Sequence, residues 1–415
     1  MFTGNKNLFH SINELINLLI MSYNIIKKIL FVLFLILLQK VVYAQQPEEV
    51  MPITKVYHDS IWYKGQKDLW HKEILKNKKN EAAWLNYFLA TRYYYRDMHL
   101  SLEDNDVIFN KLFKEMKNAI PNSFVYNLSK GWHMGSWAPY TTSMPYLLEA
   151  YRLNPKSPQI FNELIVRYEV FGMQEKKKEF CKKYYESKDI SPGLMNYNYN
   201  VLASLEKNAI VFTIGDNDTY PIWLLQEALG FRTDVLVLNI SLFGIDDYRE
   251  RKIKEAGINL SKELLDSLRI GKEVNPPRRK AMEKNIVRIL AENSDKPIYV
   301  GLTSGGEDAM KAVENDLYLV GLASKYSKER IDNIALLKKN YEQNFLLDYL
   351  KIDFNFDESA GMVNWCNQNY VTPFISLYKH YTIAGETQKA EKIKAQLVQI
   401  ASKSTREKEI LDLIK

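Results

Sequence analysis

The sequence predicts a fold of class α plus α/β, in which tetratricopeptide-like helical arms flank a Rossmann-like parallel α/β module. Two observations lead to this prediction. Aromatic and apolar residues recur at helical spacing in both the first and the last third of the chain. Between them, the β-branched runs Ile210–Ile214 and Val235–Ile240 are separated by one apolar helical stretch, which is the pattern of a βαβ unit.

The amino terminus has the parts of a secretory signal peptide. Two lysines precede the apolar run Ile29–Leu38, and a small-residue border ends at Ala44. We expect cleavage after Ala44, which makes residues 1–44 a leader that starts at Met1 or at Met21; an uncleaved membrane anchor is the alternative. The chain is therefore expected to be exported, to the periplasm or to the inner membrane of a Gram-negative bacterium.

Residues 45–205 are expected to form a tetratricopeptide-like helical domain. Trp84, Phe124 and Phe161 are spaced close to the period of helix-pair repeats, and Asn154-Pro155 ends one amphipathic stretch before another begins. Helix pairs of this kind cannot bury their apolar faces alone, so they stack into a curved array.

Residues 206–326 are expected to form the α/β module. Gly215 ends the first strand, and Pro221 lies at the start of the helical stretch Tyr220–Leu229, where proline is tolerated. Short periodic runs predict a charged helix at Arg278–Asn293 and strands at Pro297–Leu302 and Leu317–Leu322. Residues 327–415 complete the chain as a helical region with one tetratricopeptide-like pair at Thr372–Ser402, whose turn contains Gly385.

The loop after the first strand is the leading candidate site. It lies at the carboxyl edge of the predicted sheet, where open α/β sheets bind ligands. Its candidate ligand-binding residues are Gly215, Asp216, Asn217, Asp218 and Thr219. Asp216 and Asp218 would offer oxygen ligands to a divalent cation, and no other cofactor is expected. In the competing interpretation Asp218 or Thr219 caps the following helix while Asp216 satisfies loop amides.

A second loop follows the strand predicted at Pro297–Leu302. Ser304, Gly305 and Gly306 would offer backbone amides to an anion, although a plain turn also explains them. If this strand runs parallel to the first, the two loops share one sheet edge.

Arg232 and Asp234 open the second strand, and we interpret them as structural. The segment G-D-N-D-T-Y-P-I-W-L-L-Q-E, followed by R-T-D-V-L-V-L-N-I-S-L, resembles the soluble portion of the bacterial protein O-mannosyltransferase-like family of membrane proteins. The resemblance implies a shared accessory domain and an association with envelope glycosylation. Transferase chemistry is not expected to carry over, because the membrane-embedded part to which it is assigned has no counterpart in this sequence.

Charge argues against nucleic acid as a partner. The leader holds four lysines and one glutamate, so it contributes +3 of the net +6 and leaves the rest of the chain nearly balanced. The cluster Lys176–Lys178 is interpreted as a solvated helix face. Cys181 and Cys366 could pair or remain free thiols, and a zinc-binding motif and a nucleophile elbow are both absent from the sequence.

An aromatic patch contains Trp132, Trp137 and Tyr140, which are candidates for a partner surface. The competing interpretation is that they fill the gap between helix pairs. Together, these features favour an exported interaction protein that binds a protein or peptide partner of the cell envelope, accessory to envelope glycosylation. It would meet the membrane only through an uncleaved leader or a membrane partner. The alternative is a cation-dependent enzyme, or enzyme accessory, acting at Asp216 and Asp218.

Overall fold

The structure is a computed structural model that describes residues 26–31, 46–98, 100–269, 276–304, 308–352 and 356–415. Most of the predicted signal peptide, including its cleavage point, lies outside the described residues. Across the described ranges, no helix combines the length and the apolar character needed to cross a membrane.

The chain divides into two compact units, which are described separately. One contains the described residues up to Val50 together with Asp59–Leu100, and the other contains Met51–His58 and Ser101–Lys415. The first unit is built on the neighbouring helices α2 (Ser60–Lys76) and α3 (Glu81–Asp97). Each helix has a side-chain cap at its start, because Asp59 accepts from the Trp62 amide and Asn80 from the Ala83 amide.

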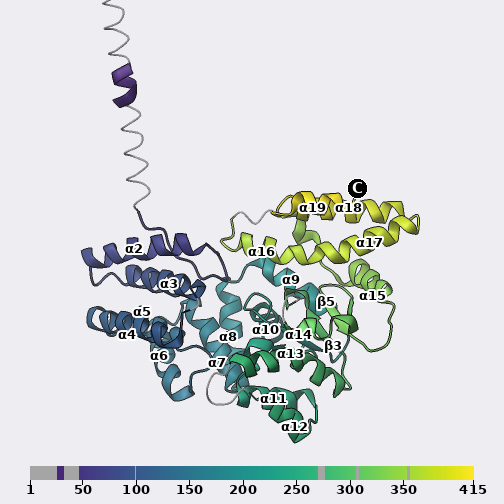
Figure 1. Ribbon diagram of the computed structural model, residues 1–415, viewed down its shortest axis with the longest axis horizontal. Helices are drawn as coiled ribbons and strands as arrows, with labels where there is room; N and C mark the ends of the chain where they lie inside the picture. Colours follow the sequence, from purple (N-terminus) through teal and green to yellow (C-terminus); the bar gives the residue numbers. More distant parts are fainter. Residues whose placement is uncertain (1–25, 32–45, 99, 270–275, 305–307, 353–355) are drawn as a thin grey trace, which may run out of the picture. The chain divides into compact units, whose positions relative to one another are not determined.

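The second unit begins with six helices. They are α4 (Leu102–Ala119), α5 (Phe124–His133), α6 (Tyr140–Leu153), α7 (Pro158–Val170), α8 (Gln174–Ser187) and α9 (Pro192–Ala203). Helices α5 and α6 pack together, as do α7 and α8. At the carboxyl terminus, α17 (Val371–Ile383) and α18 (Thr387–Ala401) form the predicted helix pair and lie side by side (Figure 1). These pairs are compatible with the predicted helical arms, while their tetratricopeptide character stays a prediction.

A small sheet lies within this second unit. Its strands are β1 (Ile210–Thr213), β2 (Leu236–Asn239), β3 (Ile298–Gly301), β4 (Leu317–Leu319) and β5 (Ala323–Tyr326). Their order is β2-β1-β3-β5-β4. Strand β1 runs parallel to both β2 and β3, and the short helix α10 (Tyr220–Glu227) connects β1 to β2. The predicted βαβ unit is therefore present, and its first strand, β1, is fully buried and lies between β2 and β3.

The predicted parallel arrangement holds for only part of the sheet. Strand β5 pairs antiparallel with both β3 and β4, so the sheet is mixed. The predicted single strand Leu317–Leu322 is in fact β4 followed by a tight turn, in which the Val320 amide donates to the Ala323 carbonyl. A short turn can join only antiparallel strands, because a parallel connection needs a crossover of about a dozen residues or more.

The remaining helices complete the second unit around the sheet. They are α11 (Asp246–Ala256), α12 (Lys262–Ser267), α13 (Pro276–Glu292), α14 (Asp308–Lys311), α15 (Asn333–Lys339), α16 (Ala360–Asn367) and α19 (Glu407–Asp412). The apolar core of this unit is continuous from α5 through the sheet to α19. Both cysteines are buried free thiols within it.

Candidate functional site

Asp218 is the centre of the loop after β1. Its side chain accepts four hydrogen bonds and the residue is 4% exposed. Oδ1 accepts from the Gly215 amide at 2.8 Å and from Thr219 Oγ1 at 3.3 Å. Oδ2 accepts from the Ile214 amide at 3.1 Å and from Thr303 Oγ1 at 2.5 Å. A carboxylate has about four lone-pair positions, so these donors fill its acceptor capacity.

This arrangement opposes a cation at Asp218. A metal ligand must direct a lone pair at the ion, whereas each oxygen of Asp218 faces two donors. Burial raises the pKa of Asp218, although all four hydrogen bonds act to lower it. Among the described residues there is also no group of three or more histidine, cysteine, aspartate or glutamate side chains placed to hold a metal.

The expectation that Asp218 or Thr219 caps the following helix is wrong. Helix α10 starts after Thr219 without a side-chain cap, and Asp218 instead accepts from two loop amides, those of Ile214 and Gly215. Asp216 itself is exposed, and its backbone carbonyl accepts from the Tyr220 amide at 3.0 Å. The sequence could not distinguish the two carboxylates, because residues two apart on an irregular loop have no fixed side-chain directions.

Thr219 joins the loops that follow β1 and β2. Its Oγ1 lies 2.8 Å from Thr213 Oγ1 and accepts from Asn239 Nδ2 at 2.9 Å. Since Thr303 follows β3 and binds Asp218, polar side chains connect the ends of all three parallel strands. The expectation that the two predicted loops share one sheet edge is thus met. The two loops bind each other at this edge, through the hydrogen bond between Thr303 and Asp218.

Asn217 connects this edge to residues 51–58. Its Nδ2 donates to the Thr54 carbonyl at 3.0 Å, while its own carbonyl accepts from Asn198 Nδ2 at 2.8 Å. Ser304 is fully buried at the same edge. Gly305 and Gly306, the other predicted anion-binding residues, lie outside the described residues.

Arg232, which precedes β2, forms hydrogen bonds with the backbone at the end of α9. Its guanidinium donates to the carbonyl oxygens of Leu202, Leu205 and Glu206 at 2.7 to 2.8 Å. Asp234 holds the guanidinium in place, with Nε to Oδ1 at 2.9 Å, and this hydrogen bond lowers the pKa of Asp234 to about 2. The pair therefore has the structural geometry expected of it, because the orphan carbonyls at a helix end need donors.

Two residues of the aromatic patch, Trp137 and Tyr140, are exposed. The Trp137 ring lies 5.4 Å from the Arg279 guanidinium, and the Tyr140 ring packs edge-on against Phe171 at 5.1 Å. Trp132 is half-buried. Their use as a partner surface stays a prediction.

An apolar groove that sequence reasoning missed lies between residues 55–57 and α16. It has a volume of about 520 Å³. Its lining residues are Lys55, Val56, Tyr57, Glu358, Gly361, Met362 and Trp365. Trp365 is 58% exposed, and Lys55 binds Asp189 at 2.7 Å and Glu358 at 3.4 Å. The two sides of the groove are about 300 residues apart in the chain, so no local pattern could predict it.

A buried charge cluster was also missed. Glu169 of α7 is fully buried and binds two ammonium groups, Lys177 Nζ at 2.8 Å and Lys252 Nζ at 2.6 Å. Burial alone would raise the pKa of Glu169, but the charges of the two lysines outweigh it and hold the pKa at about 2. Lys177 is 4% exposed, so the interpretation of its lysine cluster as a solvated face is wrong for this residue.

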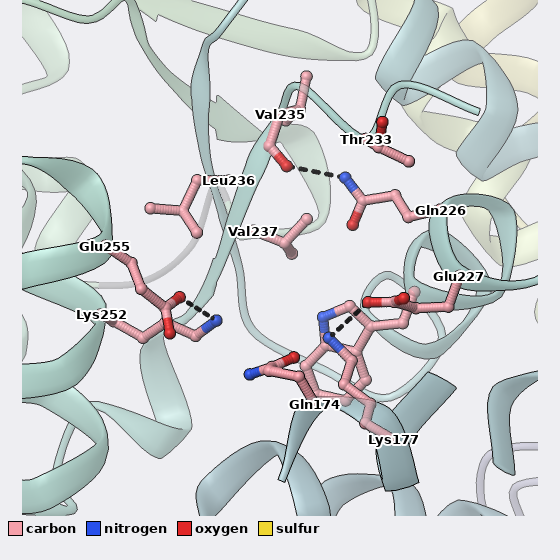
Figure 2. Close-up of a pocket in the computed structure, with 11 residues that line it drawn as sticks. Gln174, Lys177, Gln226, Glu227, Thr233, Val235, Leu236, Val237, Lys252 and Glu255 are labelled. Carbon is pink, nitrogen blue, oxygen red and sulfur yellow. Dashed lines mark hydrogen bonds and ion pairs between the residues drawn. The ribbon is translucent and has the colours of Figure 1, made fainter. Parts of the chain in front are cut away.

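Beside this cluster lies a polar pocket of about 210 Å³ (Figure 2). Its lining residues are Gln174, Lys177, Trp223, Gln226, Glu227, Thr233, Val235, Leu236, Val237, Lys252 and Glu255. Strand β2 is at the edge of the sheet and forms one wall of the pocket, while α8, α10 and α11 supply the polar side chains. The acidic loop lies at the opposite, carboxyl end of the parallel strands.

Residues 194–264 match the family described as TMEM260-associated domain 2. The matched range contains all of the G-D-N-D-T-Y-P and R-T-D-V signature, and it fits a relationship with TMEM260-like proteins. Comparison with curated proteins gave no match. The family match covers most of helix α9, the βαβ unit and α11, and thus the Arg232 contacts and the Asp218 contacts other than the one with Thr303.

Proposed function

We propose that this chain is an exported interaction protein that binds an apolar peptide segment of a cell-envelope partner, as an accessory of envelope protein glycosylation. The groove between residues 55–57 and α16 is the observation that carries the proposal. A monomeric surface seldom leaves several large apolar side chains together without a partner for them. Here Val56, Tyr57, Met362 and Trp365 line one groove.

The charges at the groove favour an apolar occupant. Lys55 is already paired with Asp189 and Glu358, so a charged ligand would have to compete with existing ion pairs. An apolar segment gains from covering Trp365 and Met362 and leaves those pairs intact. The association with glycosylation rests on the resemblance and on the family match at 194–264. The filled acceptor positions of Asp218 count against the cation-dependent alternative.

Binding of immobilised peptides tests the proposal. One set carries apolar and aromatic segments, and a second set has the same lengths with charged residues substituted. We expect saturable binding to the first set, weakened about thirtyfold by Trp365→Ala, since a buried aromatic anchor contributes about 2 kcal/mol. Ile383→Ala is the matched control, because Ile383 is an exposed apolar residue that does not line the groove. Equal weakening by both variants, or preference for the charged set, would refute this assignment.

A further inference from the structure

The pocket beside β2 presents hydrogen-bonding groups of both kinds on opposite sides (Figure 2). On one side, Lys177 Nζ lies 3.6 Å from Glu227 Oε1. On the other, Lys252 Nζ lies 2.9 Å from Glu255 Oε2. Glu169 holds both ammonium groups from the protein interior, so their positions are fixed. Each side of the pocket therefore offers a donor next to an acceptor.

The β2 wall adds backbone groups. The Leu236 amide donates to the Ala209 carbonyl beside β1, and Val237 is the next residue along the strand. Successive backbone groups on a strand point to alternate sides, so the amide and carbonyl of Val237 face away from β1, toward the pocket. At the start of the strand, Gln226 Nε2 donates to the Val235 carbonyl at 2.7 Å and thereby closes that end of the edge.

The local charge decides which ligand fits. Around the pocket, Lys177, Lys252 and Arg251, which pairs with Glu255, balance the three glutamates, so the local net charge is zero. An anion would approach three carboxylates, and a cation would approach two ammonium groups that are almost completely buried. An uncharged ligand avoids both costs. A hydroxyl group can accept from an ammonium and donate to a carboxylate at once, so several hydroxyls on a small frame match the two pairs.

The size of the pocket limits the size of its ligand. Its volume of about 210 Å³ is below the ~300–1,000 Å³ of pockets for drug-sized ligands, which selects a small compound. The same charges also protect the β2 edge from pairing with another strand. That protective role needs charges at the edge but not an open space between them.

We infer that this pocket binds a small, uncharged polyhydroxy compound, a monosaccharide or a sugar alcohol, through the Lys177–Glu227 and Lys252–Glu255 pairs. The inference goes beyond the proposed partner groove and shares no residue with it. Either can therefore fail without affecting the other.

Titration calorimetry on the purified protein tests the inference with three sets of probes. They are glucose, galactose and sorbitol; the zwitterionic amino acids glycine and glutamine; and the anions acetate and phosphate. We expect saturable binding within the first set only. Binding to amino acids or anions alone, or to none of the probes, would overturn the inference.

Two variants locate the binding. Glu227→Gln is expected to weaken it at least about tenfold, because a hydrogen bond to a charged group is lost. Glu179→Gln is the matched control, since Glu179 lies on α8 outside the pocket and pairs with Lys176 there. Gln174→Ala, at the first turn of α8, is a second pocket variant in case Glu227→Gln unfolds. Unchanged affinity in both pocket variants would place any binding elsewhere and refute the inference.

Discussion

Replacing Asp218 by asparagine is expected to destabilise the second unit, although the two side chains have the same shape. Asparagine has one oxygen and one NH₂ group, so one of the two positions now held by a carboxylate oxygen becomes a donor. At either position the NH₂ group would face a backbone amide, from Gly215 or from Ile214. The threonine hydroxyl at each position can rotate to accept a hydrogen bond from the NH₂ group, but the backbone amide can only donate.

The loss in stability can be worked out from the number of hydrogen bonds that asparagine cannot accept. Whichever way the asparagine side chain turns, one buried backbone N–H loses its acceptor, which costs about 1–3 kcal/mol. Removing the negative charge offsets part of this cost, because burial disfavours the charged form of Asp218. We therefore expect a loss of about 1–2 kcal/mol in the free energy of unfolding. Asp216→Asn, at an exposed position in the same loop, should cost less than Asp218→Asn, because water can bind the groups around an exposed side chain.

Urea unfolding followed by tryptophan fluorescence measures both variants, with and without millimolar calcium, magnesium or manganese. A ligand that binds only the folded protein must raise the unfolding midpoint. We expect no such rise for the unsubstituted protein. Equal stability of the two variants would refute the hydrogen-bond argument. A cation-dependent midpoint that disappears in Asp218→Asn would instead establish the cation site.

Three further substitutions test other contacts. Glu169→Gln should lower the free energy of unfolding at pH 7 by several kcal/mol, and this loss should become smaller as the pH falls from about 5 toward 2. The pKa of Glu169 in the folded protein is about 2, below the ordinary 4.5, so this carboxyl stabilises the fold only while it is ionised. Acid unfolding curves of both proteins measure the difference. Arg232→Lys should lower the free energy of unfolding by about 1–3 kcal/mol, because an ammonium lacks the planar fork with which the guanidinium binds three carbonyls. NMR titration should show the pKa of Asp234 returning toward its ordinary value. Gly321→Ala should cost about 1–3 kcal/mol in the same urea assay, because its Cβ would lie 2.6 Å from Ser204 Oγ.

The βαβ unit could be predicted because its signals are local. Strand β1 and helix α10 begin at the predicted residues, and Gly215 and Pro221 mark the end of the strand and the start of the helix. The hairpin from β4 to β5 was missed because Leu317–Leu322 has the composition of one apolar strand, and only Gly321 within it indicates a turn. Composition cannot tell a continuous strand from one that reverses.

The burial of Lys177 could have been predicted from helical spacing. Phe180, Cys181 and Tyr184 follow it at intervals of three, four and seven residues, and all four lie on the buried side of α8. A lysine on an apolar stripe indicates a buried charge, which needs a partner. The partner, Glu169, belongs to a different helix, so the sequence could predict the need for a carboxylate but not which one supplies it.

The two proposed binding sites differ in their relation to the family match. Nine of the eleven residues that line the polar pocket fall within 194–264, whereas every residue that lines the apolar groove falls outside it. The contacts of Asp218 and Thr219 together join three strand ends, so they fix the position of β2, and β2 in turn forms the pocket wall. A ligand of the pocket would therefore contact mainly the matched range, together with Gln174 and Lys177 of α8 outside it, whereas a partner of the groove would be particular to chains that add residues equivalent to 55–57 and α16.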